Sequence, residues 1–567
     1  MKKITIVIIF LISLSVNIYF GFQKEGFHED EYYTYFSSNR SIGLYQPDRE
    51  WQESQTILDE FTVKPGEGYN YGLVKLVQSW DVHPPLYYFI FHTLCSLTPG
   101  IFTKWSGIIT NLIAFALSFW VLYFITKSLG VDYYLRLLVL LFWGVNPQTI
   151  SCNLLIRMYS WLTFWILLCA YLHIRMILEE RAGKEKNTFY KLFLPAVMIT
   201  CFMGFLTQYF YLFFFVCIGF AFAIWLLFFR KEIKKALVYC CACAVSLILA
   251  VLAYPASVHH LLGGYRGNEA AGSLFNIENT VMRLSFFFGL LNDFVFAGAF
   301  WIIILIIIAG MIFGIITRKK DSDGRCLSEE KVSCDIKRDF LNHIEIWIIG
   351  FATVGYFLLT AKAALLVGSA SNRYEMPIYS LVIAVTFYAF GAVLKRLFGN
   401  SDSAIADRLR YDDNRAEKRK KYYKYSCYLI AVVMTTLLVK GICLDNRVLF
   451  LYPEDRDKIQ FASENEDQVV IVMFNPATPH NVWRLTDELI CYSKVYYMDE
   501  ENLEPIREKS FANIDKAILY VADDDLKEAA IDNLLSALGE GNNSSDSYLM
   551  KQLSEEDMWT TFLIEKK

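Results

Sequence analysis

The fold is decided by a hydrophobic segment at the start of the chain and the acidic stretch that follows it. The segment reads ITIVIIFLISLSVNIYFGF and covers residues 4–22. The acidic stretch, residues 27–33, reads FHEDEYY. About twenty apolar residues are enough to cross a bilayer, and the basic MKK start favours a cytoplasmic N-terminus. The sequence therefore predicts an uncleaved first span and places the acidic stretch at the outer membrane surface.

The composition of the whole chain is that of a membrane protein. The 567 residues are 55% hydrophobic and 16% aromatic, which is too apolar for a soluble protein of this size. The net charge of −4 gives no sign of a nucleic-acid partner. Most of the thirteen cysteines lie in or beside apolar runs. They predict small buried side chains, not a disulfide framework or a metal site.

Basic residues set the predicted topology, because Lys and Arg are enriched in cytoplasmic loops. Eleven spans place the dense Lys/Arg clusters, including those of the loop 318–343 and of the stretch 395–424, on the inner side. Counting the short apolar segment Leu86–Leu97 as a span would invert every later loop, so we expect it at the membrane interface. The C-terminus is then outside. The predicted spans are about 4–22, 104–126, 135–150, 158–177, 192–207, 209–229, 236–254, 292–316, 345–367, 376–394 and 425–443.

Two domains follow from this pattern. Residues 1–445 form an α-helical transmembrane domain whose outer loop, about 23–103, carries the acidic stretch. Residues 450–567 form a small extracytoplasmic α/β domain, with expected helices at about 480–491 and 524–538. This domain has no phosphate loop and no nucleophile motif, so a structural cap and a role in acceptor binding both remain open. Its expected strands are Val469–Phe474, Lys494–Met498 and Ala517–Val521.

The acidic stretch and a second polar cluster in the same loop are the first candidates for chemistry. Asp30 follows the first span by eight residues, where a carboxylate can take a proton from an acceptor hydroxyl at the level of the lipid headgroups. An acidic run that only caps a helix is the alternative. The second cluster, residues 80–88, reads WDVHPPLYY, and its two prolines make a rigid turn. Asp81 and His83 would help to position the acidic stretch, unless the cluster only starts a helix.

Three arginines on the outer side are candidates for binding a phosphate. Arg157, Arg266 and Arg373 each fall near the end of a predicted span, on the side where basic residues are sparse. A guanidinium group matches phosphate oxygens in a bidentate way. Snorkelling or purely structural arginines are the alternative for each. His259, His260 and Tyr209 face the same side without a motif that assigns them a role.

The order of these motifs resembles that of a known family. An Asp-Glu pair after the first span is followed by His-Pro-Pro-Leu-Tyr-Tyr, by Arg157-Met158-Tyr159 and by an Arg-Tyr-Glu-Met-Pro turn at 373–377. This arrangement, over residues 1–400, is similar to membrane glycosyltransferases of the GT-C superfamily. The nearest branch contains protein O-mannosyltransferases and lipid A aminoarabinose transferases, and is glycosyltransferase family 39-like. Three departures are visible. The acidic run Glu29-Asp30-Glu31 has three acids, so the match to the family can shift by one residue. The family's helix-2 arginine has no clear counterpart, Lys104 being the nearest basic residue, and no glutamate precedes Arg157.

The resemblance implies an inverting transfer of a sugar from a polyprenyl-phosphate donor to the hydroxyl of a protein, lipid or envelope-polymer acceptor, at the bilayer and without a metal or other cofactor. Asp30 matches the base, and Glu31 matches the second acid of the pair. A transporter or flippase for a lipid-linked envelope precursor and a non-catalytic family member are the alternatives. The substrate-binding residues that the resemblance implies are His83, Arg157, Tyr159, Arg266, Arg373 and Tyr374.

Overall fold

The computed structural model describes residues 2–39, 47–183, 186–318, 342–398, 413–502, 504, 514–538, 548–556 and 558–567. The loop 319–341 and the segment 399–412, which carry part of the basic charge used to predict the topology, lie outside the described residues. The chain divides into two compact units. Unit 1 comprises residues 1–22, 78–87 and 107–449, and unit 2 comprises residues 23–77, 88–106 and 450–567.

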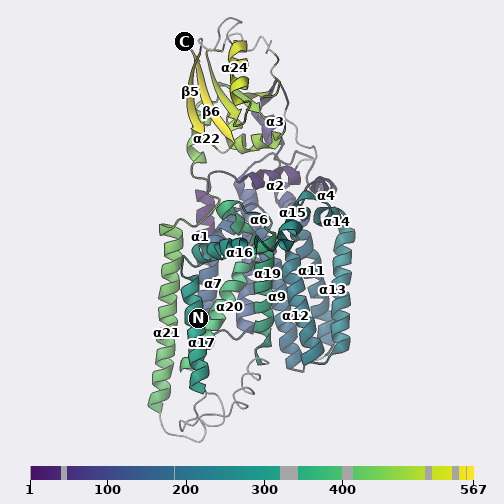
Figure 1. Ribbon diagram of the computed structural model, residues 1–567, viewed down its shortest axis with the longest axis vertical. Helices are drawn as coiled ribbons and strands as arrows, with labels where there is room; N and C mark the ends of the chain where they lie inside the picture. Colours follow the sequence, from purple (N-terminus) through teal and green to yellow (C-terminus); the bar gives the residue numbers. More distant parts are fainter. Residues whose placement is uncertain are drawn as a thin grey trace. The chain divides into compact units, whose positions relative to one another are not determined.

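Unit 1 is a bundle of apolar helices whose spans match the predicted ones (Figure 1). The described part of the chain has nine helices long and apolar enough to cross a membrane, or eleven if each of two bent pairs is one span. The protein is therefore a multi-pass membrane protein. The nine consist of α1 (Lys2–Gln23), α6 (Lys104–Ser128), α9 (Tyr159–Arg181), η1 with α11 (Phe189–Phe193, Leu194–Thr207), α12 with η2 (Tyr211–Ile224, Trp225–Phe229), α13 (Ile233–Ala253), α19 (Ile344–Ala363), α20 (Met376–Phe398) and α21 with η6 (Asp413–Val439, Lys440–Leu444).

The third predicted span is broken in the middle. Helix α7 (Tyr133–Gly144) and helix α8 (Pro147–Leu154) meet at 45°. The break has a local cause, because Pro147 cannot continue the ladder of α7 and the Asn146 side chain accepts a hydrogen bond from the backbone N–H of Gln148 at 3.1 Å. The Asn146 amide also donates to the Val295 carbonyl at 3.0 Å, so the break is fixed by a buried hydrogen bond.

The eighth predicted span, 292–316, begins later than expected. Helix α16 (Thr280–Leu290) and the π-helical turn η3 (Leu291–Val295) form one arm, which meets α17 (Phe300–Arg318) at 92°. The sequence placed residues 292–299 inside the span, but residues 292–295 belong to the first arm and residues 296–299 make the corner between the two arms. The short segment expected at the interface is helix α5 (Leu86–Cys95), which is too short to cross a bilayer.

Helix α1 packs closely against the C-terminal end of α7. A Cβ on Gly144 would overlap the Ser13 side chain, so the glycine permits a close approach of the two backbones. The buried Asn17 amide donates to the Gly144 carbonyl at 3.0 Å, and the Asn153 amide donates to Asn17 Oδ1 at 2.8 Å. The amides of Asn17 and Asn153 are thus paired inside the bundle, where an unpaired polar group would be costly.

Unit 2 contains a six-stranded mixed sheet in the order β1-β3-β2-β4-β6-β5. The predicted strands are observed as β2 (Val469–Phe474), β3 (Lys494–Asp499) and β4 (Lys516–Ala522), and all three are parallel to their neighbours in that group. Their near-continuous apolar sequence fits burial on both faces. Three strands were not predicted: β1 (Glu50–Glu53), β5 (Tyr548–Glu555) and β6 (Trp559–Lys566).

The two faces of this sheet carry separate cores. One core includes Tyr496, Leu519 and helix α24 (Lys527–Leu538), and the other includes Tyr497, Ile518 and residues of the segment 482–489. Neighbouring residues of a strand point to opposite faces, which explains the division. The predicted helix 480–491 is a 3-10 segment, η7 (Pro479–Leu485), followed by the short α23 (Thr486–Leu489), while α24 agrees with the predicted helix 524–538.

The first outer loop folds together with the C-terminal residues in unit 2. Strand β1 pairs antiparallel with β3, with Trp51 opposite Tyr496, and helix α3 (Ser54–Asp59) follows β1 directly. Residues 23–77 therefore group with the α/β part of the chain and not with the spans. Several cysteines that were expected inside the core, Cys240, Cys241 and Cys443, instead lie on the outer surface of the helices.

Candidate active site

The acidic stretch forms the first turn of helix α2 (Glu29–Asn39), where negative charge is favoured by the helix dipole. His28 precedes the helix, and its Nδ1 accepts a hydrogen bond from the backbone N–H of Asp30 at 3.1 Å. In return, Glu31 Oε2 accepts from the backbone N–H of His28 at 2.5 Å. This reciprocal pattern is a capping box in which histidine replaces the usual serine or threonine. Local capping therefore fixes the orientation of all three residues.

Glu31 is also one half of a buried ion pair. Lys24 Nζ lies 2.9 Å from Glu31 Oε2, and both side chains are fully buried. The same ammonium group donates to the Phe450 carbonyl at 2.9 Å and lies over the ring of Tyr452. Removing one partner of such a pair leaves a buried charge uncompensated, which typically costs about 3–5 kcal/mol. The carboxylate of Glu31 is thus committed to holding the segment 24–31 in place.

Asp30 has a different environment, although it is the next residue in the same turn. Its side chain is 27% exposed, and Oδ2 lies 3.7 Å from Nδ1 of His28. Because that nitrogen accepts from a backbone N–H, the imidazole is in its neutral form with the proton on Nε2. The contact between Asp30 and His28 is therefore not an ion pair. Of Asp30 and Glu31, the two acids that we predicted to be catalytic, Asp30 is the one that solvent reaches.

Tyr32 connects helix α2 to helix α23 within unit 2. The Tyr32 hydroxyl donates to Asp487 Oδ2 at 3.1 Å. Burial raises the pKa of Asp487 to about 7, although the hydrogen bond from Tyr32 opposes the rise. Sequence reasoning missed this carboxyl, because Asp487 is separated from Tyr32 by more than 450 residues and no local pattern marks it.

In unit 1, His83 lies between a carboxylate and a guanidinium group. His83 Nδ1 is 2.9 Å from Asp81 Oδ2, and His83 Nε2 is 3.1 Å from Arg157 Nη2. Arginine has no acceptor, so Arg157 donates to Nε2 and the His83 proton must be on Nδ1, where it is donated to Asp81. The three groups therefore form one chain of hydrogen bonds, running from Asp81 through His83 to Arg157.

This chain orients Arg157 and keeps Asp81 ionised. Burial alone would raise the pKa of Asp81, but its interactions with His83, including the hydrogen bond, and the positive charge of Arg157 outweigh it, so that the pKa lies below its ordinary value. The Tyr254 hydroxyl donates to the His83 carbonyl at 3.4 Å and adds a contact to the rigid His-Pro-Pro turn. Arg157 is itself only 3% exposed and lies in the short link between α8 and α9.

The remaining predicted binding residues gather at the same end of the helix bundle. Tyr159, the first residue of α9, packs edge-on against Tyr374 with ring centroids 5.9 Å apart. Arg373 lies over the Tyr374 ring at 5.1 Å, at the end of the 3-10 segment η4 (Gly368–Tyr374). Arg266, in α15 (Tyr265–Phe275), is half-exposed and pairs with Glu269 at 3.1 Å.

Histidine and tyrosine side chains extend this group. His260, in α14 (Ala256–Leu262), is buried, and its Nε2 lies 3.4 Å from the Ser79 carbonyl. Its Nδ1 therefore accepts from the Tyr209 hydroxyl at 3.0 Å. Burial lowers the pKa of His260, which favours this neutral form. His259, the neighbouring histidine, is exposed.

Three further charged side chains at this end of the bundle were not singled out from the sequence. Lys362 donates to the Asn276 carbonyl, just before α16, at 2.6 Å, and Arg283 donates to the Ala361 carbonyl at 3.1 Å. Both cations therefore have structural roles. Lys362 could have been noticed in the sequence, because it lies inside the predicted span 345–367 and a charged residue within a span is costly.

Glu375 is the third of these residues. It is completely buried, and neither carboxylate oxygen has a hydrogen-bond partner among the described residues. Burial raises its pKa well above the ordinary value, so the group is held neutral. Among the described residues, no group of three or more His, Cys, Asp or Glu is placed to hold a metal ion.

The fold and these residues define a multi-pass membrane protein that carries an acidic first helical turn in one unit and an arginine cluster in the other. The sequence matches no protein-family model and no curated protein. Solved structures do match. ArnT from Cupriavidus metallidurans, bound to undecaprenyl phosphate, has 11% identity and a TM-score of 0.47, covering 98% of this chain and 97% of that chain.

An archaeal oligosaccharyltransferase is also similar. AglB from Archaeoglobus fulgidus, in complex with an inhibitory peptide and a dolichol-phosphate, has 12% identity and a TM-score of 0.47, covering 97% of this chain and 72% of that chain. At such identities a likeness concerns the fold only. We therefore base the function on the side chains of this protein.

Proposed function

We propose that this protein is a membrane glycosyltransferase of GT-C type that moves a sugar from a polyprenyl-phosphate donor to an acceptor hydroxyl outside the membrane. The observation that supports this most directly is that Asp30 and Glu31, neighbours in the acidic stretch, have different surroundings. Glu31 is consumed by a buried ion pair and a helix cap, whereas Asp30 stays partly exposed beside it. A partly exposed carboxylate in a helical turn held by a cap is well placed for proton transfer.

The proposed reaction is a single displacement with inversion. The acceptor hydroxyl loses its proton to the Asp30 carboxylate while its oxygen forms a bond to the anomeric carbon. The bond from that carbon to the phosphate oxygen breaks, and the polyprenyl phosphate leaves with the electron pair. Glu31 acts as a positioning residue in this scheme, because moving its charge would break the contact with Lys24.

Positive side chains would stabilise the charge that grows on the leaving phosphate. Arg157 is the leading candidate, since the chain from Asp81 through His83 orients its guanidinium group before substrate arrives. Arg373 is the second; it lies over the ring of Tyr374, which in turn packs on Tyr159. Arg266 is more exposed and already paired with Glu269, so its contribution would be smaller. Positioning a lipid-anchored donor in this way supplies part of the rate advantage.

The test is a transfer assay with the purified full-length protein in lipid. A radiolabelled polyprenyl-phosphate sugar serves as donor, and protein, lipid and polymer fractions from the source cells serve separately as acceptors. Label appearing in one fraction, together with release of polyprenyl phosphate, supports the proposal. Movement of the intact donor across proteoliposomes without transfer would instead identify a flippase. Neither transfer nor movement, in protein that still binds donor, would identify a non-catalytic member.

A further inference from the structure

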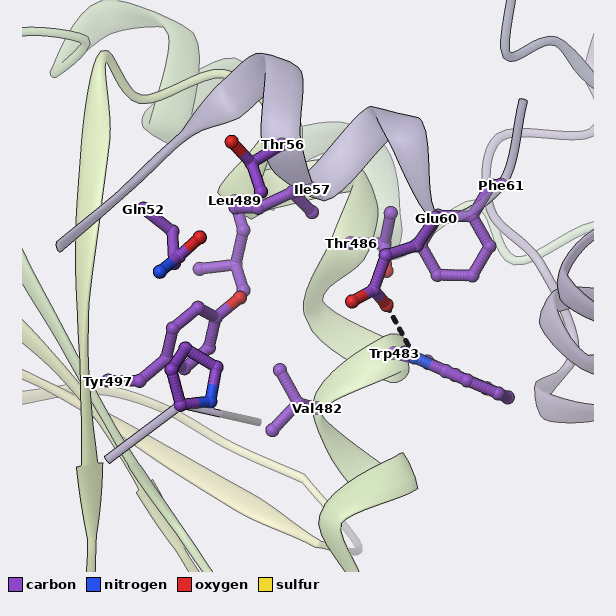
Figure 2. Close-up of a pocket in the computed structure, with 11 residues that line it drawn as sticks. Gln52, Thr56, Ile57, Glu60, Phe61, Val482, Trp483, Thr486, Leu489 and Tyr497 are labelled. Atoms are coloured by element: carbon purple, nitrogen blue, oxygen red, sulfur yellow. Dashed lines mark hydrogen bonds between the residues drawn. The ribbon is translucent and has the colours of Figure 1, made fainter. Parts of the chain in front are cut away.

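A small pocket in unit 2 is lined by none of the predicted site residues, although Tyr33 packs on Trp483 at its wall with ring centroids 5.0 Å apart. It has a volume of about 30 Å³ and lies where β1 and α3 of the first outer loop meet η7, α23 and strand β3. Figure 2 shows its lining, with the amide of Gln52 and the ring of Tyr497 on one side and the carboxylate of Glu60 and the indole of Trp483 on the other. The first outer loop and the C-terminal residues therefore build this pocket jointly.

The polar lining of the pocket is rich in groups that bind hydroxyls. Glu60 Oε2 accepts from Trp483 Nε1 at 3.3 Å, which fixes the carboxylate at the wall. A side-chain amide both donates and accepts, as do a phenol and a hydroxyl, so Gln52, Tyr497 and Thr486 can each satisfy either half of a ligand hydroxyl. Ile57, Val482 and Leu489 supply the apolar part of the wall.

The charge of the lining selects an uncharged ligand. The residues that line the pocket include one acid, Glu60, and no Lys, Arg or His. A phosphate or carboxylate would meet repulsion from Glu60 and find no cation, and a buried charge without a partner is costly. A neutral hydroxyl-bearing group, by contrast, can donate to the carboxylate and exchange hydrogen bonds with the amide and phenol.

The size of the pocket further restricts which ligand groups can enter it. A volume of about 30 Å³ accommodates roughly two water-sized groups. That is the size of a hydroxymethyl group, and it is too small for a whole sugar ring. Thr56 is exposed and Gln52 is half-exposed, so that polar side chains also continue from the pocket toward solvent. A hexose carries further hydroxyls beside its hydroxymethyl arm, and these could hydrogen-bond to Thr56 and Gln52.

We propose that this pocket binds the hydroxymethyl arm of a neutral hexose in the acceptor, so that the acceptor is a glycan. The inference rests on the proposed transferase function for its biological meaning. The binding itself needs neither donor nor catalysis. Failure to bind would therefore leave the proposed transfer intact, and failure of transfer would leave the binding site intact.

The test is saturation-transfer NMR on the full-length protein without donor. Methyl β-D-glucopyranoside and methyl β-D-xylopyranoside are the probes, because they differ only by the hydroxymethyl arm. We expect the glucoside to bind at least severalfold more tightly, with the strongest saturation on its arm. Equal binding of the two probes, or no binding of either, would overturn the proposal. So would stronger binding of N-acetylserinamide, since that outcome assigns the pocket to a serine side chain.

Neighbouring tyrosines of β3 provide a matched pair of variants. Tyr497→Phe removes one hydroxyl from the pocket and keeps the ring, whereas Tyr496→Phe makes the same change on the opposite face of the sheet. Tyr497→Phe should weaken glucoside binding severalfold, and Tyr496→Phe should leave it unchanged. Gln52→Leu, at a half-exposed position, should weaken binding in the same way. If Tyr497→Phe and Gln52→Leu bound the glucoside as tightly as Tyr496→Phe does, the assignment would be contradicted.

Discussion

Asp30 and Glu31 are neighbours in one helical turn, yet their surroundings give them different chemistry. Glu31 faces Lys24 and the backbone N–H of His28, and Asp30 faces a neutral imidazole at the surface. The sequence identified both acids, but it could not tell which one is buried in an ion pair with Lys24. The pairing depends on Lys24, seven residues away, and on the Phe450 carbonyl, which is 426 residues from Lys24 in the sequence.

Arg157 provides a test of the orienting chain. Lysine keeps the charge at this position and loses the planar fork that matches a phosphate. We expect Arg157→Lys to lower donor turnover about 10–100-fold at saturating donor. The control is Arg175→Lys in α9, the helix that follows Arg157, where the arginine pairs with Glu179 at 2.6 Å. Loss of turnover in both variants would indicate a general effect on α9 and would count against the role of Arg157.

At the scale of elements, the breaks between helices carry the candidate residues. Arg157 lies where α8 gives way to α9, and Arg373 lies in η4 just before α20. Hydropathy predicted these spans well, because spans of about twenty apolar residues leave a strong signal. It placed α7 and α8 in one helix, since an Asn-Pro pair in an apolar run does not reveal which way the chain turns. The capping bonds of Asn146 show why it turns there.

The close contact of α1 with α7 gives a prediction about packing. Gly144→Ala should destabilise the protein, because the added Cβ overlaps the Ser13 side chain. Overpacking of this kind typically costs about 1–3 kcal/mol. Adding Ser13→Gly to the variant removes the obstructing atoms and should restore much of the lost stability. Thermal unfolding of the purified protein measures both effects, and a double variant no better than Gly144→Ala would refute the contact.

The contact between α2 and α23 gives a prediction about pH. Burial raises the pKa of Asp487 to about 7, so the folded protein holds this proton more tightly than the unfolded chain does. Its contribution to stability is therefore full below about pH 4 and is lost as the pH rises toward 7. Asp487→Asn resembles the protonated form and still accepts from Tyr32.

The difference in stability between Asp487→Asn and the wild type should grow as the pH rises. Near pH 4 the two proteins should be equally stable, and at pH 8 Asp487→Asn should be more stable by roughly 4 kcal/mol, since each pKa unit is worth about 1.4 kcal/mol. Unfolding temperatures recorded over this range measure the difference. A useful comparison is Tyr520→Phe. It removes the hydroxyl that donates to Glu488, the other acid of the same segment. A difference that stays constant from pH 4 to pH 8 would contradict the raised pKa.

At the scale of the whole molecule, the limits of the sequence lie in long-range pairing. The three apolar strands β2, β3 and β4 were found from their composition. Strand β1 was missed because EWQE has no apolar alternation, and it becomes a strand only by pairing with β3, more than 400 residues later. The pocket between them could not be predicted for the same reason.

The topology gives a prediction for the whole chain. Basic residues such as Arg181, Arg230 and Lys395 should lie inside, with the C-terminal residues outside. Alkaline phosphatase fused after Lys567 should be active, and a fluorescent protein fused there should stay dark. Fusions that end at Lys231, in the turn between η2 and α13, should give the reverse result. An active phosphatase at Lys231 would overturn the predicted orientation.

The most direct test of the central proposal is to measure sugar transfer by two variants with substitutions at neighbouring residues. Asp30→Asn removes the proposed base, and Glu29→Gln makes the equivalent change on the preceding residue of the same helical turn. We expect Asp30→Asn to lower transfer from the polyprenyl-phosphate donor at least about 100-fold with donor binding kept, and Glu29→Gln to change it little. Full activity of Asp30→Asn would contradict the account.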